Sequence, residues 1–226
     1  MIRTILHLSK AFHILIVDDN SPDGTAEIVR NMIKKHPEQI FMIERKGKLG
    51  LGTAYLAGFK WSLDQKYQYI FEMDADFSHN PEDLIRLYQA CADEGADLAI
   101  GSRYISGINV INWPLKRVLM SYMASKYVRM ITGMKIMDTT AGFKCYRSNI
   151  LDRIDLDRIK MKGYGFQIEM KFKTWRLGFK IVEVPIIFTD RREGASKMSG
   201  GIFGEAFKGV IKMKIGSYFS NPGKKS

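Results

Sequence analysis

The chain has 226 residues, enough for one domain with a sizeable core, and an ordinary hydrophobic content of 46%. Its net charge of +11 indicates an anionic partner, and the absence of aromatic-rich basic repeats or zinc-ligand spacing argues against nucleic acid. Cys91 and Cys145 form no metal or redox motif, and no apolar run reaches the roughly 18 residues of a spanning helix, so a cytoplasmic chain, soluble or peripheral on a membrane, is expected.

The first half of the chain alternates short apolar runs with amphipathic segments. Strands are predicted where an apolar run stops at turn residues, and helices where N-cap residues precede a 3.6-residue apolar period. This alternation predicts an α/β fold with a parallel sheet, in which ligands gather at the carboxyl ends of the strands. The predicted order is helix 1–11, strand 13–17, helix 25–36, strand 40–44, helix 53–64, strand 69–73, helix 81–95 and strand 97–104.

Acidic and basic side chains follow three of these predicted strands. Asp74 and Asp76 come directly after an apolar run, where burying a carboxylate without a partner is costly. Two hard oxygen ligands suit a divalent cation that also holds phosphate oxygens, although a pair of solvated turn aspartates is the alternative. Asp18 and Asp19 end the strand at 13–17, and Arg103 ends another. These strand-end positions predict a single site.

The second half of the chain is more basic. Helices are predicted over 115–132 and 166–177, and a strand over 180–188 whose Pro185 indicates an edge position. Gln167 and Glu169, near the start of the second helix, either orient the site or make structural hydrogen bonds. The stretch 202–219 is amphipathic and either docks on the sheet or lies at a membrane interface. We therefore expect one domain over 1–201 and an amphipathic basic tail over 202–226.

Four segments in this order resemble the inverting family 2 glycosyltransferases of the GT-A fold: residues 17–25 (VDDNSPDGT), 50–55 (GLGTAY), 73–76 (MDAD) and 101–104 (GSRY). Four more resemble the polyprenol-phosphate (dolichol-phosphate) mannose synthases: 113–117 (WPLKR), 163–170 (GYGFQIEM), 184–186 (VPI) and 190–197 (DRREGASK). The resemblance covers about residues 13–205. It implies a single-domain, Rossmann-like, mostly parallel sheet flanked by helices.

The resemblance implies transfer of mannose from GDP-mannose to a polyprenyl phosphate with inversion, assisted by Mg²⁺ or Mn²⁺. It also implies a peripheral position on the cytoplasmic face of a membrane, with a separate membrane subunit as a candidate partner. Asp76 and Arg191 are the expected catalytic residues. Asp74 and Asp76 are the expected metal ligands, with Ser78, where some relatives carry Gln, acting through a water. The expected substrate-binding residues are Ile16, Asp18, Asp23, Asp74, Ala75, Asp76, Arg103, Arg191 and Lys197, of which Asp23 equally suits a helix cap.

These residue types suit the implied chemistry. A nucleotide-sugar donor leaves as a nucleoside diphosphate, so negative charge builds up that a cation held by Asp74 and Asp76 would neutralise. A phosphate monoester acceptor has a second pKa of about 6 and is already largely ionised near neutral pH. No general base is therefore assigned, and His79 is interpreted as a turn residue rather than a catalyst.

The N-terminus departs from the pattern of the resembled family, which implies a first strand ending in a Pro-Thr-Tyr-Asn-Glu-like turn. Only 12 residues precede the strand at 13–17, so that strand is expected to be missing, with residues 1–9 as the remnant of the helix after it. Two alternatives stay open. One keeps the acceptor but uses another nucleotide sugar, such as UDP-glucose, and the other is a degenerate, non-catalytic binder of nucleotide or lipid phosphate.

Overall fold

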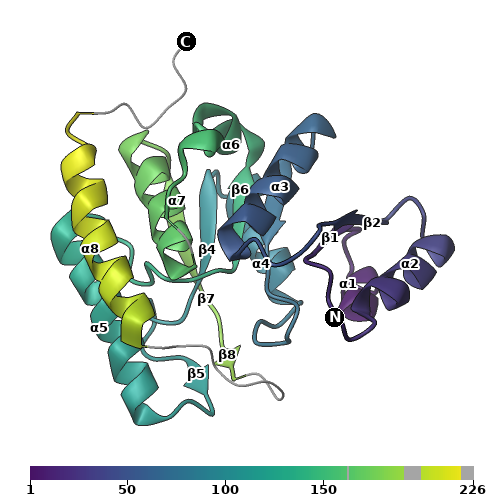
Figure 1. Ribbon diagram of the computed structural model, residues 1–226, viewed down its shortest axis with the longest axis horizontal. Helices are drawn as coiled ribbons and strands as arrows, with labels where there is room; N and C mark the ends of the chain where they lie inside the picture. The colour runs from purple at the N-terminus through teal and green to yellow at the C-terminus, as the bar shows by residue number, and fades with distance from the viewer. Residues whose placement is uncertain (162, 191–199, 220–226) are drawn as a thin grey trace.

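The computed structural model describes residues 1–161, 163–190 and 200–219, with the backbone alone for 200–206. Helices and strands alternate through the first half, as the apolar periodicity predicts (Figure 1). In chain order the elements are α1 (Ile2–Leu6), β1 (Ile14–Asp18), α2 (Thr25–Lys35), β2 (Ile40–Glu44), α3 (Leu51–Asp64), β3 (Tyr69–Glu72), α4 (Asp83–Ala92), β4 (Leu98–Ser102), β5 (Val110–Ile111), α5 (Leu115–Thr132), β6 (Lys144–Arg147), α6 (Ser148–Arg153), a 3₁₀ turn (Leu156–Arg158), α7 (Tyr164–Arg176), β7 (Ile181–Pro185), β8 (Phe188–Thr189) and α8 (Gly200–Gly216).

The central sheet has four strands in the order β3-β6-β4-β7. β4 and β7 are parallel, whereas β6 is antiparallel to both of its neighbours, β3 and β4. β3, β4 and β7 therefore run in one direction and β6 in the other. β7 lies at the edge of the sheet, which confirms the position predicted from Pro185, a residue that cannot donate a ladder hydrogen bond.

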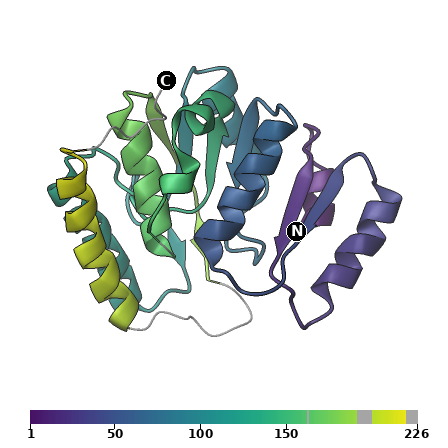
Figure 2. The same ribbon diagram turned by 45° about the horizontal axis from the view of Figure 1, so that its top comes forward.

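β1 and β2 form a separate parallel pair in register from Ile14 opposite Ile40 to Asp18 opposite Glu44. This pair, with α1 and α2, lies beside the central sheet, and α3 lies between them and the rest of the molecule (Figures 1 and 2). α3 contacts both β1 and β3, so it joins the two sheets. A third, short parallel pair joins β5 and β8.

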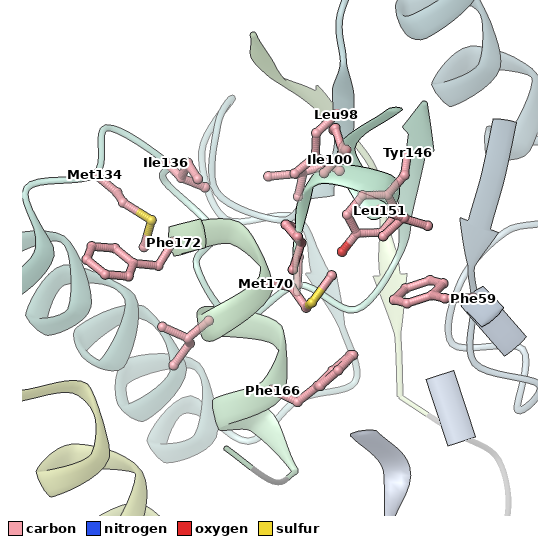
Figure 3. Packing of buried hydrophobic residues seen from close by; sticks show 14 of the residues in the cluster. Phe59, Leu98, Ile100, Met134, Ile136, Tyr146, Leu151, Phe166, Met170 and Phe172 are labelled. Carbon is pink, nitrogen blue, oxygen red and sulfur yellow. The ribbon is translucent and has the colours of Figure 1, made fainter. Parts of the chain in front are cut away.

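Two apolar clusters cover the two faces of the central sheet. Successive side chains of a strand point to opposite faces, so Leu98 and Ile100 enter one cluster and Ala99 the other. The larger cluster lies beneath α3, α5 and α7, and Figure 3 shows Phe166 and Met170 of α7 within it. The smaller one packs α4 and α1 against the opposite face.

β6 is the main element that the sequence did not predict. Lys144 and Arg147 bracket its four residues, so it has neither a long apolar run nor a clear period of two. Lys144, Cys145 and Tyr146 are nevertheless fully buried. The strand is stabilised by its place between β3 and β4, which a local pattern does not reveal.

α8 packs against α5 and α7. Val210 is buried in the larger cluster, and the Phe207 ring stacks on Tyr127 of α5 at 3.5 Å between centroids. The amphipathic stretch predicted over 202–219 is therefore a helix that docks on two helices rather than on the sheet.

Candidate functional site

The chain bends sharply where β3 ends, over residues 74–78, which we call the acidic turn. Asp76 Oδ1 accepts hydrogen bonds from the Ser78 backbone N–H at 3.1 Å and from the Ser78 hydroxyl at 2.5 Å. Phe77, between them, has a φ of 60°, a left-handed conformation that is uncommon outside glycine. The turn is thus built by hydrogen bonds to Asp76. Ser78, predicted to reach a metal through a water, donates its hydroxyl hydrogen bond to Asp76 in the structure.

Asp74 is held from the other side by α3. The Tyr55 hydroxyl donates a hydrogen bond of 2.9 Å to Asp74 Oδ1. Burial of the hydroxyl raises the pKa of Tyr55 well above its ordinary value, and the negative charges of Asp74, Glu72 and Asp76 raise it further. Negative charge is therefore concentrated at the acidic turn, where a cation would be favoured.

A fully buried polar network lies directly before the acidic turn. Glu72 accepts hydrogen bonds from Tyr146 and Gln167, each at 2.9 Å, and pairs with Lys144 at 3.1 Å. Lys144 also donates to the Gln167 side-chain oxygen. Burial lowers the pKa of Lys144, while the Glu72 charge opposes that shift. Each member has a hydrogen-bond partner, which is what makes a buried ion pair tolerable.

Arg103, at the end of β4, is paired with the fully buried Asp138. Its Nε and Nη2 donate to the two Asp138 oxygens at 2.7 Å each, and Nη2 also donates to Thr140 at 2.8 Å. Burial alone would lower the pKa of Arg103, but the Asp138 charge outweighs it and raises that pKa. The same pairing lowers the pKa of Asp138 against the opposing effect of burial. Arg103 is thus a fixed, permanently charged group.

A cavity of about 150 Å³ connects these groups to the helices of the second half. Asp74, Asp76 and Arg103 line it, and so does one face of α5 from Arg117 to Val128. That face extends along about three helical turns. Its remaining walls are largely apolar and come from α7, α8 and the β7–β8 segment, including Ile168, Ile186, Phe188, Phe207 and Val210.

Arg117 is a cavity residue that was not among the predicted site residues. Its Nη1 lies 2.8 Å from both Asp190 oxygens, and its guanidinium lies 4.1 Å from the centre of the Trp113 ring. Its Nε is buried without a hydrogen-bond partner among the described residues. The signal for this role was present in the WPLKR segment, where Arg117 follows Trp113 and Pro114 at the start of α5.

His79 is placed in the bend, as predicted, but its ring is buried between Phe143 and Phe188. Burial lowers the pKa of His79, although the nearby Asp74 charge opposes this shift. The imidazole is therefore expected to be neutral near neutral pH. Its Nδ1 has no hydrogen-bond partner within the described part of the chain.

The structure brings some of the predicted site residues together and leaves others apart. Asp74, Asp76, Ser78 and Arg103 share the cavity, whereas Ile16, Asp18, Asp23 and Ala75 are not among its lining residues. Arg191 and Lys197 lie outside the described residues. The structure thus brings four of the predicted residues together around β3 and β4, and their role as one site stays a prediction.

The carboxyl end of β1 forms a second group of polar residues. Asp18 is buried and accepts a hydrogen bond from the Ser21 backbone N–H at 3.0 Å. Arg45, which sequence reasoning missed, donates to Asp19 at 2.5 Å and to Thr53 at 2.8 Å. Asp23 accepts hydrogen bonds from the Thr25 N–H and hydroxyl, so it contacts the first residue of α2, whose N-cap position is Gly24.

The acidic turn fits a cation that is shared with a ligand. Among the residues that the structure describes, no group of three His, Cys, Asp or Glu side chains is placed to hold a metal ion. Mg²⁺ in proteins is commonly bound by one or two carboxylates together with substrate phosphates and water. Asp74 and Asp76 match that donor set, so the residues present suit a cation bound together with a diphosphate.

Comparison with known proteins places the chain in a family. Residues 1–155 match the profile of glycosyl transferase family 2. The chain belongs to glycosyl transferase family 2. Over 215 residues it is 47% identical to the polyprenol monophosphomannose synthase of Mycolicibacterium smegmatis, covering 95% of this chain and 81% of the relative. Over 199 residues it is 49% identical to the undecaprenyl-phosphate mannosyltransferase of Micrococcus luteus, covering 88% of this chain and 81% of the relative.

Solved structures confirm the fold of this family 2 chain. The glucosyl-3-phosphoglycerate synthase of Mycobacterium tuberculosis, in complex with phosphoglyceric acid, superposes with a TM-score of 0.62 at 15% identity, covering 88% of this chain and 68% of that chain. Its complex with Mg²⁺ and uridine-diphosphate gives a TM-score of 0.61 at 12% identity, covering 91% and 80%. The predicted GT-A α/β class is confirmed, and the chain is a glycosyltransferase.

None of the helices in the described residues combines the length and the apolar character needed to cross a membrane.

Proposed function

We propose that this family 2 glycosyltransferase transfers mannose from GDP-mannose to a polyprenyl phosphate with inversion, giving polyprenyl-phosphate mannose. The observation that carries the proposal is the cavity, which is lined by three carboxylates and two arginines in one part and by apolar side chains from three helices elsewhere. A donor diphosphate needs the first part, and an isoprenoid chain suits the second. Two relatives, a polyprenol monophosphomannose synthase and an undecaprenyl-phosphate mannosyltransferase, support this acceptor and sugar.

The donor would bind between the acidic turn and the end of β1. Asp74, Ala75 and Asp76 would contact the sugar diphosphate, and Ile16 and Asp18 the nucleoside. Mg²⁺ or Mn²⁺, held by Asp74 and Asp76, would neutralise the charge that develops on the leaving diphosphate. Ser78 keeps Asp76 oriented through its two hydrogen bonds.

The acceptor phosphate would bind on the arginine side of the cavity. Arg103 and Arg117 both line it, and Arg191 and Lys197 follow Asp190, which pairs with Arg117. Guanidinium groups suit bidentate contacts with phosphate, and a lysine supplies a point charge. Because a phosphate monoester is already ionised near neutral pH, the reaction needs no general base, and the buried, neutral His79 is not assigned as one.

The lipid part of the acceptor would enter from a membrane surface beside α5 and α8. Large apolar side chains are exposed on both helices, together with basic residues that anionic headgroups would attract. The exposed apolar residues include Leu115, Leu119, Met123 and Met130 on α5 and Ile211 and Ile215 on α8, and the basic ones include Lys126, Lys208 and Lys212. We therefore propose peripheral attachment to the cytoplasmic face of a membrane, with or without a separate membrane subunit.

A transfer assay with purified chain tests the function. The chain is incubated with polyprenyl phosphate in detergent, Mn²⁺ or Mg²⁺, and either GDP-mannose or UDP-glucose, and the lipid product is extracted. The proposal expects a mannosyl lipid from GDP-mannose that disappears with EDTA. Product from UDP-glucose alone would favour the other donor. No product from either donor, with nucleotide still bound, would favour a non-catalytic binder.

A further inference from the structure

Tyr55 touches the proposed metal site without being a candidate ligand of its own. Its hydroxyl donates to Asp74 Oδ1 at 2.9 Å, and Asp74 lines the cavity. The other oxygen, Oδ2, lies near Gly142, 4.0 Å from where a Cβ of that residue would stand. One carboxylate oxygen is thus engaged by Tyr55, and the glycine adds no side chain beside the other.

The Tyr55 ring is one of three aromatic rings that stack on one another. It lies parallel to Phe166 of α7, with 5.9 Å between centroids and 9° between planes, and Phe59 of α3 stacks on both at 6.5 Å. Gly52, one turn before Tyr55, makes this approach possible, because a Cβ there would meet the Phe166 ring at 2.9 Å. The packing of α3 against α7 therefore determines where the Tyr55 hydroxyl lies.

We infer that Tyr55 is a positioning residue that orients the Asp74 carboxylate for the divalent cation. The inference rests on the proposed function, which assigns that cation to Asp74 and Asp76. A carboxylate on a short side chain rotates freely unless a hydrogen bond fixes it. Partners that orient a ligating carboxylate typically contribute 10- to 100-fold in metal affinity. The inference gives segment 50–55 a structural role. Gly52 allows α3 to approach α7 closely, and Tyr55 donates a hydrogen bond to the acidic turn.

The test compares Mn²⁺ binding by the full-length chain and its variants, with and without GDP, from the electron paramagnetic resonance signal of free Mn²⁺. Tyr55→Phe keeps the stacked ring and removes the hydroxyl alone. It is expected to weaken Mn²⁺ binding by about tenfold. Saturating Mn²⁺ is expected to restore most of its turnover, because a positioning role raises the metal requirement more than it lowers kcat. Binding within about twofold of wild type would overturn the inference.

Tyr146→Phe is the matched control. Its hydroxyl donates to Glu72 at the same distance of 2.9 Å, two residues before Asp74, so both variants lose one hydrogen bond to a carboxylate. Mn²⁺ affinity is expected to persist in Tyr146→Phe even where its melting temperature falls. An equal loss of affinity in both variants would show general loosening and would also overturn the inference.

Two further variants separate the inference from the function on which it rests. If Asp74→Asn binds Mn²⁺ as tightly as wild type, the proposed cation site is wrong. If Asp74→Asn binds weakly while Tyr55→Phe is unchanged, Tyr55 alone is wrong. Should Tyr55→Phe not fold, Gly52→Ala replaces it, since the added Cβ must displace Phe166 and the ring stacked on it. Unchanged Mn²⁺ affinity in Gly52→Ala would count against the inference.

Discussion

At the scale of single residues, the charged groups of the site are held by partners before any substrate arrives. Asp76 accepts two hydrogen bonds from Ser78, and the Arg103 guanidinium donates two to Asp138. Such prior orientation lets a site stabilise developing charge without reorganising during the reaction. Loss of an acidic residue of the site is expected to weaken metal binding, whereas loss of an arginine is expected to weaken phosphate binding.

Asp76→Asn tests the metal role. The amide keeps an oxygen that can accept the Ser78 hydrogen bonds, so the fold and melting temperature are expected to stay near wild type. Losing the negative charge is expected to lower mannosyl transfer by about a hundredfold or more. Turnover is measured at saturating donor and acceptor with increasing Mn²⁺. Wild-type turnover in this variant would rule out Asp76 as a ligand.

Arg117→Met tests the acceptor side. It removes the guanidinium from the cavity and is expected to raise the KM for polyprenyl phosphate by about tenfold, the effect of one charged hydrogen bond. The KM for GDP-mannose is expected to change much less. Lys116→Met is the control, because it removes one exposed positive charge from the neighbouring position of α5. Equal effects of the two variants would indicate a general electrostatic role.

At the scale of elements, α5 has two faces with different tasks. Arg117, Ser121, Ala124 and Val128 recur every three or four residues and line the cavity. The residues between them include exposed Leu119 and Met123. α8 repeats this division, with Val210 buried against α5 and α7 and Ile215 exposed. The two helices therefore connect the cavity to an apolar outer surface.

Ile215→Asp tests the outer surface of α8. Placing a charge on this surface is expected to weaken binding to anionic vesicles by about tenfold or more, since burying one such side chain contributes about 1.5–3 kcal/mol. Sedimentation with vesicles containing 30% or so of anionic lipid measures the change. Ile28→Asp is the control, because this α2 residue is similarly exposed, 63% against 55%. Helix α2 lies at the opposite end of the molecule from α8 (Figure 1). Equal losses would contradict a membrane face at α8.

At the scale of the whole molecule, a fully buried lysine joins the site to the core. Lys171 of α7 donates to the backbone oxygens of Thr139 and Ala141, at 3.1 and 2.6 Å. It thereby holds the segment that carries Asp138, the partner of Arg103. Burial lowers the pKa of Lys171 well below its ordinary value, and the charge of Lys144 lowers it further. Burying Lys171 therefore orders the site but lowers the free energy of unfolding by an amount that depends on pH.

The sign of that dependence follows from proton binding. Between the lowered pKa of folded Lys171 and its unfolded value of about 10.4, the unfolded chain binds more protons, so stability rises with pH. One group contributes at most about 1.4 kcal/mol per pH unit, and the rise ends near the unfolded pKa. Lys171→Met is expected to have a shallower rise of unfolding free energy with pH on the approach to the unfolded pKa of about 10.4, measured by urea unfolding. A slope equal to that of wild type would contradict this assignment, and Lys208→Met, exposed on α8, controls for loss of a charge.

Local signals in the sequence were sufficient to predict much of the secondary structure and the acidic turn. Apolar periodicity, cap residues and glycines predicted the long helices and the strands β1 to β4, because these features depend on neighbouring residues. The acidic turn was predicted from Asp74 and Asp76 after an apolar run, because burying a carboxylate without a partner is costly. The edge position of β7 was predicted from Pro185, because proline cannot donate a ladder hydrogen bond.

The sequence by itself thus determined the family, which segments are helices or strands, and the pair Asp74 and Asp76. Each of these depends on residues that are close together in the chain. Only the tertiary structure decided which side chains meet. It placed β6 between β3 and β4, Tyr55 on Asp74, Asp138 on Arg103 and Arg117 in the cavity. The hydrogen-bonded partners are far apart in the sequence: Tyr55 and Asp74 are separated by 19 residues, and Arg103 and Asp138 by 35. No local period or spacing encodes such contacts, since they arise when helices and strands pack around a shared core.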